Sequence, residues 1–400
     1  MDILCLMGLF PDEYRAQIEK DSIKGMQNAA NKLQWAIVRG LDQIVDVKAS
    51  IVNSLYIGSY PKRYKKLMIP SFPFHHKEGA NDINVGFCNL SGLKFFSRYF
   101  SARKAVVKWA KSKSDDKKVL LIYAMTTPFV NIAEYIKKKF PEIKICLVVP
   151  DLPEHMRPGK SDSKSFYSIL KQREIKMLRR MLKKVDSYVL LTDAMKEWFG
   201  YPITYTVVEG IAMPTSVSTE SVEKKKTILY AGGINVQYGT LDLVKSFIAT
   251  GRDDWELSLY GDGSALEQIR EVAKDHPNVK LHGMVPNTTV VAAQKEAAVL
   301  VNPRKNQIFT KYSFPSKILE YMSSGTPVLA YKLDGIPNEY DPYFFHIEDT
   351  ENGLTNALEH VMSLTDEERA DMGEKARTFV AENKNPRCQC QKIVDMLNNL

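Results

Sequence analysis

The residues with the clearest chemical potential lie at the start of a predicted helix, in the stretch Phe-Pro-Ser-Lys-Ile-Leu-Glu that ends at Glu320. Pro315 predicts the first turn of this helix, and the backbone amides of a helix start favour a phosphate beside Ser316 and Lys317. Lys317 and Glu320 are three positions apart and share one helical face. A cation for a diphosphate and a carboxylate for ribose hydroxyls would together hold a nucleotide diphosphate. An exposed ion pair explains the same spacing equally well.

Two glycine turns could add backbone contacts to the same ligand. Gly232 and Gly233 follow the apolar run Thr-Ile-Leu-Tyr-Ala, and Gly261, Asp262 and Gly263 follow the next run. Because glycines carry no side chain, they let a phosphate approach backbone amides. Ligands of parallel α/β sheets bind beyond the carboxyl ends of the strands, so both turns are candidates for one site. A tight turn without a ligand is the alternative at each.

The elements that must position these residues repeat a strand–helix pattern along the whole chain. Short apolar runs alternate with helical stretches, which is typical of parallel α/β sheets. In the first half, strands are expected near 2–7, 46–52, 83–88, 118–124, 145–150, 187–192 and 204–209, and helices near 22–40, 93–112, 129–140, 163–185 and 193–199. The pattern restarts with a strand at 227–233. The sequence therefore predicts an α/β protein with two doubly wound, Rossmann-like units.

The length and one polar segment predict where the units divide. A chain of 400 residues is too long for one compact core. The segment 213–226 contains Pro214 and has no apolar periodicity, which is typical of a linker. We predict an N-terminal domain at 1–212, a C-terminal domain at 213–385, and a C-terminal helix at 386–400 that packs back on the N-terminal domain.

The charge of the chain is uneven. Residues 1–212 carry 35 Lys and Arg against 21 Asp and Glu, a net of +14, whereas the remainder carries 20 against 26. A basic half of this kind is expected to face an anionic partner. The sequence contains no motif that reads nucleic acid, so nucleic acid is not the expected partner.

Two basic helices make an anionic membrane surface the expected partner of the N-terminal domain. The helix at 93–111 is surrounded by cations and carries an apolar row formed by Phe95, Tyr99, Ala102, Val106 and Trp109. The helix at 163–185 carries eight cations against one acidic residue. Such helices can lie on anionic lipid, and the alternative is that each row packs on its own sheet.

The termini and the cysteines indicate the compartment. The start MDILCLMGLF lacks a basic region and is expected to form a strand rather than a signal peptide, and no apolar run in the sequence is long enough to span a bilayer. The odd number of five cysteines argues against a disulfide framework, and Cys388-Gln-Cys390 has no second pair with zinc spacing. We expect a cytoplasmic protein, peripheral on the inner face of the membrane, that binds no metal.

With these motifs in this order, residues 227–345 resemble glycosyltransferase family 4. The resemblance rests on the turns at Gly232 and Gly261 and on the run from Phe314 to Val328, Phe-Pro-Ser-Lys-Ile-Leu-Glu-Tyr-Met-Ser-Ser-Gly-Thr-Pro-Val. The chain is most similar to members that build capsules and exopolysaccharides. The resemblance implies a retaining enzyme with the GT-B fold, in which two Rossmann-like domains face each other across a cleft. The N-terminal domain would hold the acceptor and the C-terminal domain the nucleotide sugar.

The resemblance also implies roles for single residues. The donor-binding residues would be Gly232, Gly233, Gly261, Asp262, Ser316, Lys317 and Glu320, with Glu320 on the ribose. Tyr312 stands where the family usually has a first glutamate, and the loop 234–239 lacks the Arg and Lys of many members. The charge of the diphosphate would then be met by backbone amides and Lys317, with Arg304 or Lys311 as a further cation.

On the acceptor side, Asp151 matches the aspartate of a His-Asp pair that family members often carry after a strand. Pro150 replaces the histidine of that pair, and His155 follows closely as a second polar candidate, with a surface role as its alternative. Lys317, Asp151 and Arg304 are therefore the expected catalytic residues.

The expected function is retaining transfer of a sugar from a UDP- or GDP-linked donor to a glycan or lipid-linked glycan in surface polysaccharide biosynthesis. No cofactor or metal is expected, since the sequence lacks the Asp-x-Asp triplet of the metal-dependent transferase fold. Two alternatives remain at this point. One is a nucleotide-sugar epimerase, which needs no acceptor. The other is a non-catalytic GT-B partner that stabilises another transferase, which Tyr312 favours and the intact Lys317 and Glu320 disfavour.

Overall fold

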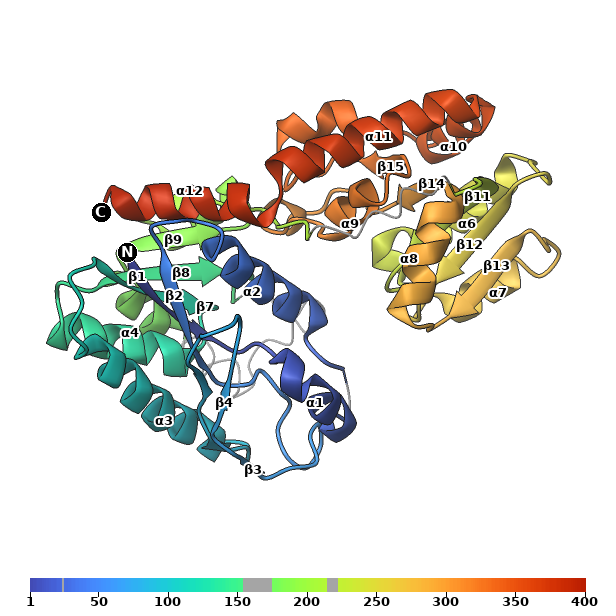
Figure 1. Ribbon diagram of the computed structural model, residues 1–400. Coiled ribbons are helices and arrows are strands. Elements are labelled where there is room, and N and C mark those ends of the chain that lie inside the picture. The colour runs from blue at the N-terminus through green and yellow to red at the C-terminus, as the bar shows by residue number, and fades with distance from the viewer. Residues whose placement is uncertain (24, 154–174, 214–221) are drawn as a thin grey trace. The chain divides into compact units, whose positions relative to one another are not determined.

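The computed structural model describes residues 1–23, 25–153, 175–213 and 222–400 of the chain. They form an N-terminal unit of Met1–Ile211 with Pro386–Leu400, and a C-terminal unit of Ala212–Asn385. Each unit contains a sheet of mainly parallel strands covered by helices (Figure 1). The prediction of two doubly wound α/β units is confirmed.

The N-terminal unit is built on an eight-stranded sheet with the order β10-β9-β8-β7-β1-β2-β5-β4. Its strands are β1 (Asp2–Met7), β2 (Lys48–Asn53), β4 (Phe72–Phe74), β5 (Asp82–Asn84), β7 (Lys118–Tyr123), β8 (Lys144–Val149), β9 (Ser187–Leu190) and β10 (Tyr205–Val207). All neighbours are parallel except β4 and β5. A small antiparallel pair joins β3 (Met68–Ile69) to β6 (Phe87–Cys88). The central strands read as continuous apolar runs because both of their faces are buried.

Helices cover both faces of this sheet (Figure 1). α3 (Leu93–Ala110) and α4 (Thr127–Lys139) pack against each other on one face, and α2 (Asn28–Leu41) packs with α12 (Pro386–Asn398) on the other. The short α1 (Arg15–Asp21) precedes α2. Since a Cβ on Gly40 would lie 2.3 Å from the Pro386 carbonyl oxygen, glycine permits the close contact of α2 and α12.

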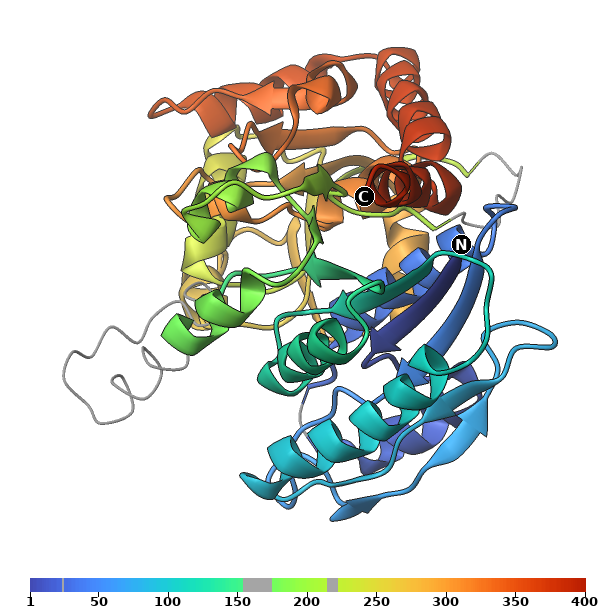
Figure 2. The same cartoon turned by 90° about the vertical axis from the view of Figure 1, so that its left-hand side faces the viewer.

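The two ends of the chain lie near each other in this unit (Figure 2). The N–H of Asp2 donates to the Lys117 carbonyl (2.9 Å), and Lys117 Nζ donates to the Leu397 carbonyl (2.7 Å). The Cys390 thiol, buried between α12 and α2, donates to the Ile37 carbonyl (3.3 Å). The last helix of the chain is therefore part of the N-terminal core.

The C-terminal unit has a six-stranded parallel sheet with the order β13-β12-β11-β14-β15-β16. Its strands are β11 (Lys225–Ala231), β12 (Glu256–Tyr260), β13 (Val279–Gly283), β14 (Ala297–Asn302), β15 (Val328–Tyr331) and β16 (Phe345–Ile347). α6 (Thr240–Ala249) packs against α7 (Leu266–Val272) and α10 (Gly353–Ser363), while α8 (Asn287–Glu296) and α9 (Lys317–Ser323) contact β14, and α11 (Asp366–Asn383) packs on α9. The strand order reverses between β11 and β14, which is where such sheets bind ligands.

Three expectations about local structure need correction. The helix predicted at 22–40 begins only at Asn28. The strand predicted at 83–88 is two short strands, β5 and β6, with Gly86 between them. At Gly86 the chain passes very close to Ile69, since a Cβ there would lie 2.8 Å from the Ile69 carbonyl oxygen. The helix predicted at 193–199 is a 3₁₀ helix. Of the helix predicted at 163–185, residues 175–182 are helical and the part before 175 lies outside the described residues.

The apolar row predicted on α3 is also wrong in part. The buried residues of this helix are Arg98, Ala102, Val106 and Ala110, whereas Phe95 is 44% exposed. The reason is the side chain of Arg98, which finds hydrogen-bond acceptors beneath the helix and so takes an inward position that its charge alone would disfavour.

Two kinds of feature are absent from the part of the chain that the structure describes. No group of three or more His, Cys, Asp or Glu residues there could hold a metal ion. No helix there is long and apolar enough to cross a membrane.

Candidate functional site

The turns after β11 and β12 form the floor of the candidate site. The N–H of Gly232 donates to the Tyr260 carbonyl (2.8 Å), and the N–H of Ile234 donates to the Asp262 carbonyl (2.9 Å). A Cβ on Gly261 would lie 1.9 Å from the Gly232 carbonyl oxygen, so only glycine permits this approach. The two glycine turns are therefore packed directly against one another at the carboxyl ends of adjacent strands.

Gly232 makes room for the side chain of Lys317. A Cβ on Gly232 would lie 1.4 Å from Lys317 Nζ and 2.4 Å from its Cε. Because the N–H of Gly232 is already donated to Tyr260, this glycine contributes space rather than the free amide expected from the sequence. The N–H of Gly233 makes no hydrogen bond among the described residues and remains open to a ligand.

Lys317 carries its charge in a largely desolvated place. Its Nζ donates to Tyr230 Oη (3.3 Å) and lies 4.5 Å from the centroid of the Tyr230 ring. Burial lowers the pKa of Lys317 to about 8, with Glu320 opposing this decrease and Arg304 adding to it. An anionic ligand would favour the charged form of this lysine and would compensate the desolvation.

Glu320 lies one turn after Lys317 on α9 and is half-buried. Its Oε1 accepts a hydrogen bond from Gln294 Nε2 of α8 (3.2 Å), which restricts the orientation of the carboxylate. Ser316, at the N-cap of α9, is exposed, and α9 has only seven residues. The structure thus brings the predicted cation and carboxylate together on one short helix.

Arg304, two residues after β14, supplies a second cation. Its guanidinium lies 5.4 Å from the Tyr238 ring centroid and 4.9 Å from that of Phe309, and burial lowers its pKa. The buried Nε of Arg304 has no hydrogen-bond partner among the described residues. An unpartnered buried donor costs about 1–3 kcal/mol, so an acceptor atom of a ligand would be stabilised here.

Asp262 and Tyr312 show more local roles. The exposed Asp262 accepts a hydrogen bond at Oδ1 from the N–H of Gly263 (2.7 Å), as is usual in a tight turn. Tyr312, at the position of the family's first glutamate, ends the 3₁₀ turn Thr310–Tyr312. The Nζ of Lys311 lies 4.7 Å from the centroid of the Tyr312 ring. A tyrosine therefore stands where the family that the sequence resembles usually has a glutamate.

Asp151 is not among the residues that the C-terminal unit brings together. It belongs to the N-terminal unit, where it follows β8 by two residues and is exposed. His155, the second polar candidate of that loop, lies outside the described residues.

Two tyrosines that the sequence analysis missed connect α9 to the end of β11. Tyr321 Oη accepts a hydrogen bond from the N–H of Ala231 (2.9 Å) and donates to the Ala231 carbonyl (3.2 Å). Tyr230 Oη donates to the Gly233 carbonyl (2.8 Å). Both rings are almost fully buried. The sequence did place one tyrosine beside the first glycine turn and one directly after Glu320. Since a buried Tyr usually needs a hydrogen-bond partner, these two residues could have been predicted to bond nearby backbone groups.

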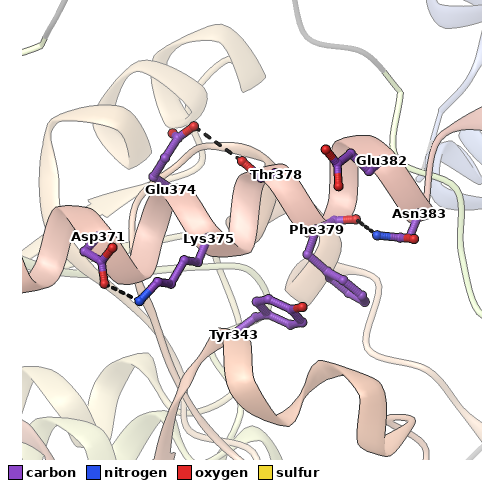
Figure 3. Close-up of a pocket in the computed structure, with 8 residues that line it drawn as sticks. All are labelled: Tyr343, Asp371, Glu374, Lys375, Thr378, Phe379, Glu382 and Asn383. Atoms are coloured by element: carbon purple, nitrogen blue, oxygen red, sulfur yellow. Dashed lines mark hydrogen bonds and ion pairs between the residues drawn. The ribbon is translucent and has the colours of Figure 1, made fainter.

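A separate hollow of about 280 Å³ lies on α11 and carries no comparable chemistry (Figure 3). Lys375 is paired with Asp371 (2.5 Å), and Glu374 is paired with Arg377 (2.6 Å). The ring of Tyr343 stacks on Phe379 at one side of the hollow, with 4.2 Å between centroids. None of the predicted site residues lines it.

Comparison with known proteins identifies the family of the segment that contains the site. Residues 225–364 match the family model described as glycosyl transferases group 1. This segment includes Lys317, Glu320, Arg304 and both glycine turns. No protein with a curated description matches the chain by sequence.

Solved structures share the fold over the whole chain. A sucrose-phosphate synthase from Thermosynechococcus elongatus is 12% identical, with 100% of this chain and 99% of that chain covered and a TM-score of 0.63. Anabaena HepE in complex with UDP is 14% identical, with 100% of both chains covered and a TM-score of 0.60. The lipopolysaccharide outer core galactosyltransferase WaaB is 14% identical, with 100% of this chain and 99% of that chain covered and a TM-score of 0.59. These identities are low enough that the likeness shows the fold alone.

Proposed function

We propose that this chain, a group 1 glycosyltransferase with the GT-B fold, is a retaining enzyme that takes its sugar from a nucleotide-diphosphate donor. The observation that carries the proposal is the position of Lys317, whose ammonium lies against Gly232 at the end of β11. The half-buried Glu320 follows one turn later on the same helix. The positive charge of Arg304 is close enough to help lower the pKa of Lys317. The family match over 225–364 supports the proposal, and the UDP bound to Anabaena HepE supports a UDP- or GDP-linked donor.

Each group of the C-terminal unit would have a distinct role in this reaction. The diphosphate would contact the ammonium of Lys317, the guanidinium of Arg304 and the N–H of Gly233, while the ribose hydroxyls would donate to Glu320. At neutral pH a lysine with a pKa of about 8 is mostly protonated, and a bound diphosphate would raise that pKa. Lys317 would then stabilise the negative charge that develops on the departing diphosphate.

The N-terminal unit would hold the acceptor, which we propose to be a glycan or a lipid-linked glycan of a capsule or exopolysaccharide. Asp151 is exposed at the carboxyl end of β8 and could accept the proton of the acceptor hydroxyl. We assign this role to Asp151 because its position matches the aspartate of the His-Asp pair in the family that the sequence resembles.

We also propose that the protein is cytoplasmic and binds the inner face of the membrane peripherally. On α3, the side chains of Leu93, Phe96 and Phe100 are exposed to 55%, 66% and 56%, and their spacing places them on one face. Lys104 is exposed one turn after Phe100. An exposed apolar face with flanking cations fits an anionic lipid surface, to which each nearby Lys or Arg adds about 1 kcal/mol.

A donor screen tests the proposed activity. We expect UDP- or GDP-linked sugars to raise the thermal midpoint of the full chain in excess chelator, since a ligand that binds only the native state stabilises it. We expect nucleotide release from that donor to increase when acceptor glycans are added. Conversion of the donor sugar without an acceptor would instead indicate an epimerase. Binding without any turnover would indicate a non-catalytic partner.

A further inference from the structure

A pocket of about 590 Å³ lies in the N-terminal unit. It is lined mainly by the residues that follow α1, by the segment 56–63 after β2, and by Leu90 and Ser91 just before α3. Lys62 and Arg63 are the charged residues among the described lining, and no described lining residue is a carboxylate. The volume is typical of a site for a small molecule.

The two cations of the pocket have no acidic partner in the part of the chain that the structure describes. Lys62 and Arg63 are exposed, and no ion pair is found for either among the described residues. The backbone fixes Arg63: its N–H donates to the Ser59 carbonyl (3.0 Å), and its Cβ would lie 2.2 Å from a Cβ on Gly58. The carboxylate that ends α1, Asp21, is already bound by Lys66 Nζ at 3.0 Å.

Two further cations lie behind the wall of this pocket. Lys94 Nζ donates to the Ile57 carbonyl (2.5 Å), and Arg98 Nε donates to Ser54 Oγ (2.9 Å). Arg98 is only 8% exposed. Burial lowers the pKa of Lys94 to about 8 and that of Arg98 to about 10. Since both side chains bind neutral oxygens rather than carboxylates, their charges add to those of Lys62 and Arg63.

We propose that this pocket binds a phosphate group carried by the acceptor. Arg63 offers a planar pair of donors that matches phosphate, Lys62 adds a second charge, and the hydroxyls of Ser59 and Ser91 are further donors. Tyr56 lines the same pocket, and an aromatic side chain there suits contact with an attached sugar. The phosphate can belong to a phosphorylated sugar or to the head group of a lipid. The inference rests on the proposed function, because it assigns the acceptor to the N-terminal unit.

Calorimetric titration of the full chain, with UDP in excess to occupy any nucleotide site, tests the proposal. The probes are sn-glycerol 3-phosphate and glucose 6-phosphate, with glycerol and glucose as their unphosphorylated counterparts. We expect only the phosphorylated probes to bind, at least tenfold more weakly to Arg63→Gln and about threefold more weakly to Lys62→Gln. Lys138→Gln, which removes one exposed charge on α4, should bind as the wild type does.

A vesicle arm identifies the source of the phosphate. Vesicles of phosphatidylcholine with phosphatidic acid are compared with phosphatidylcholine alone. Arg63-dependent binding that sn-glycerol 3-phosphate displaces would support the proposal with a lipid head group, and Arg63-dependent binding of the soluble probes alone would support it with a phosphorylated sugar. Equal binding of phosphorylated and unphosphorylated probes, or unchanged affinity in Arg63→Gln, would overturn it. UDP and GDP are titrated in parallel. If either nucleotide binds and the phosphates do not, only the pocket assignment fails. If the phosphates bind and neither nucleotide does, the proposed function is contradicted.

Discussion

Replacing Lys317 with Met removes a partly buried ammonium that lies beside the end of β11, while keeping a side chain of similar length. Burial lowers the pKa of Lys317 from 10.5 to about 8, and each unit corresponds to 1.36 kcal/mol. At pH 7 both the folded and the unfolded states are protonated, so burying the charge costs the ligand-free protein about 3 kcal/mol. Loss of the contacts with Tyr230 offsets roughly 1 kcal/mol of this gain. The free energy of unfolding should therefore rise by about 1–3 kcal/mol.

The pH dependence of this gain has a definite sign. Between pH 8 and 10.5 the folded protein binds fewer protons at Lys317 than the unfolded chain, so wild-type stability from this group rises with pH. The advantage of Lys317→Met should shrink accordingly, with the cost of the buried charge falling from about 3 kcal/mol at pH 7 to about 1 kcal/mol at pH 9.5. Above pH 10.5 this cost should be close to zero.

Urea denaturation of both proteins at pH 7 and pH 9.5 measures the effect, and a UDP titration by thermal shift measures the accompanying loss of donor binding. Lys274→Met, an exposed lysine paired with Glu271, is the control and should change stability by less than about 0.5 kcal/mol. A destabilised Lys317→Met at pH 7, or a gain that is the same at both pH values, would refute the reasoning.

Three further outcomes are expected. Gly232→Ala should displace the ammonium that this glycine now accommodates and weaken UDP binding at least tenfold by calorimetry, while circular dichroism shows the fold retained. Burial opposes protonation of His76, but the carboxylates of Asp42 and Asp82 raise its pKa to about 9, so its contribution is complete below about pH 6.5 and is lost as the pH rises through 9. His76→Gln should thus be less stable than wild type by about 1–3 kcal/mol at pH 6 and similar at pH 10 in urea. Phe96→Ser should reduce flotation with anionic vesicles at low salt, and high salt should release the wild type; flotation equal to wild type would reject the membrane surface.

Local spacing was enough to predict much of the C-terminal unit. A strand that ends in two glycines and a helix that carries Lys317 and Glu320 on one face are both properties of short segments, so the pattern reveals them. The hydrogen bonds that set these segments against each other are not local. Tyr321 reaches Ala231 across 90 positions of the chain, and no periodicity reports such a contact.

The N-terminal unit shows where the pattern fails. The predicted row on α3 included Phe95 and left Arg98 among the cations that surround the row, which is the usual rule for an amphipathic helix. The structure reverses both, because Arg98 finds the hydroxyl and carbonyl of Ser54 beneath the helix. Likewise, β3 and β6 have two residues each, too few to show an alternation of polar and apolar side chains. Burial of a polar group depends on partners far away in the sequence, and these appear only in the folded chain.

The most direct test of the proposed donor site is calorimetric titration of UDP, GDP and uridine in excess chelator into wild type, Lys317→Ala and Glu320→Ala. Lys317→Ala removes a charge-assisted contact to the diphosphate. The nucleoside diphosphate that wild type binds should therefore bind to this variant about 10- to 150-fold more weakly, while the affinity for a nucleoside should be unchanged. Glu320→Ala should weaken the nucleotide and the nucleoside alike, because its partner would be the ribose. Unchanged affinity of both variants for the nucleotide would contradict the assignment of this site to a nucleotide-diphosphate sugar.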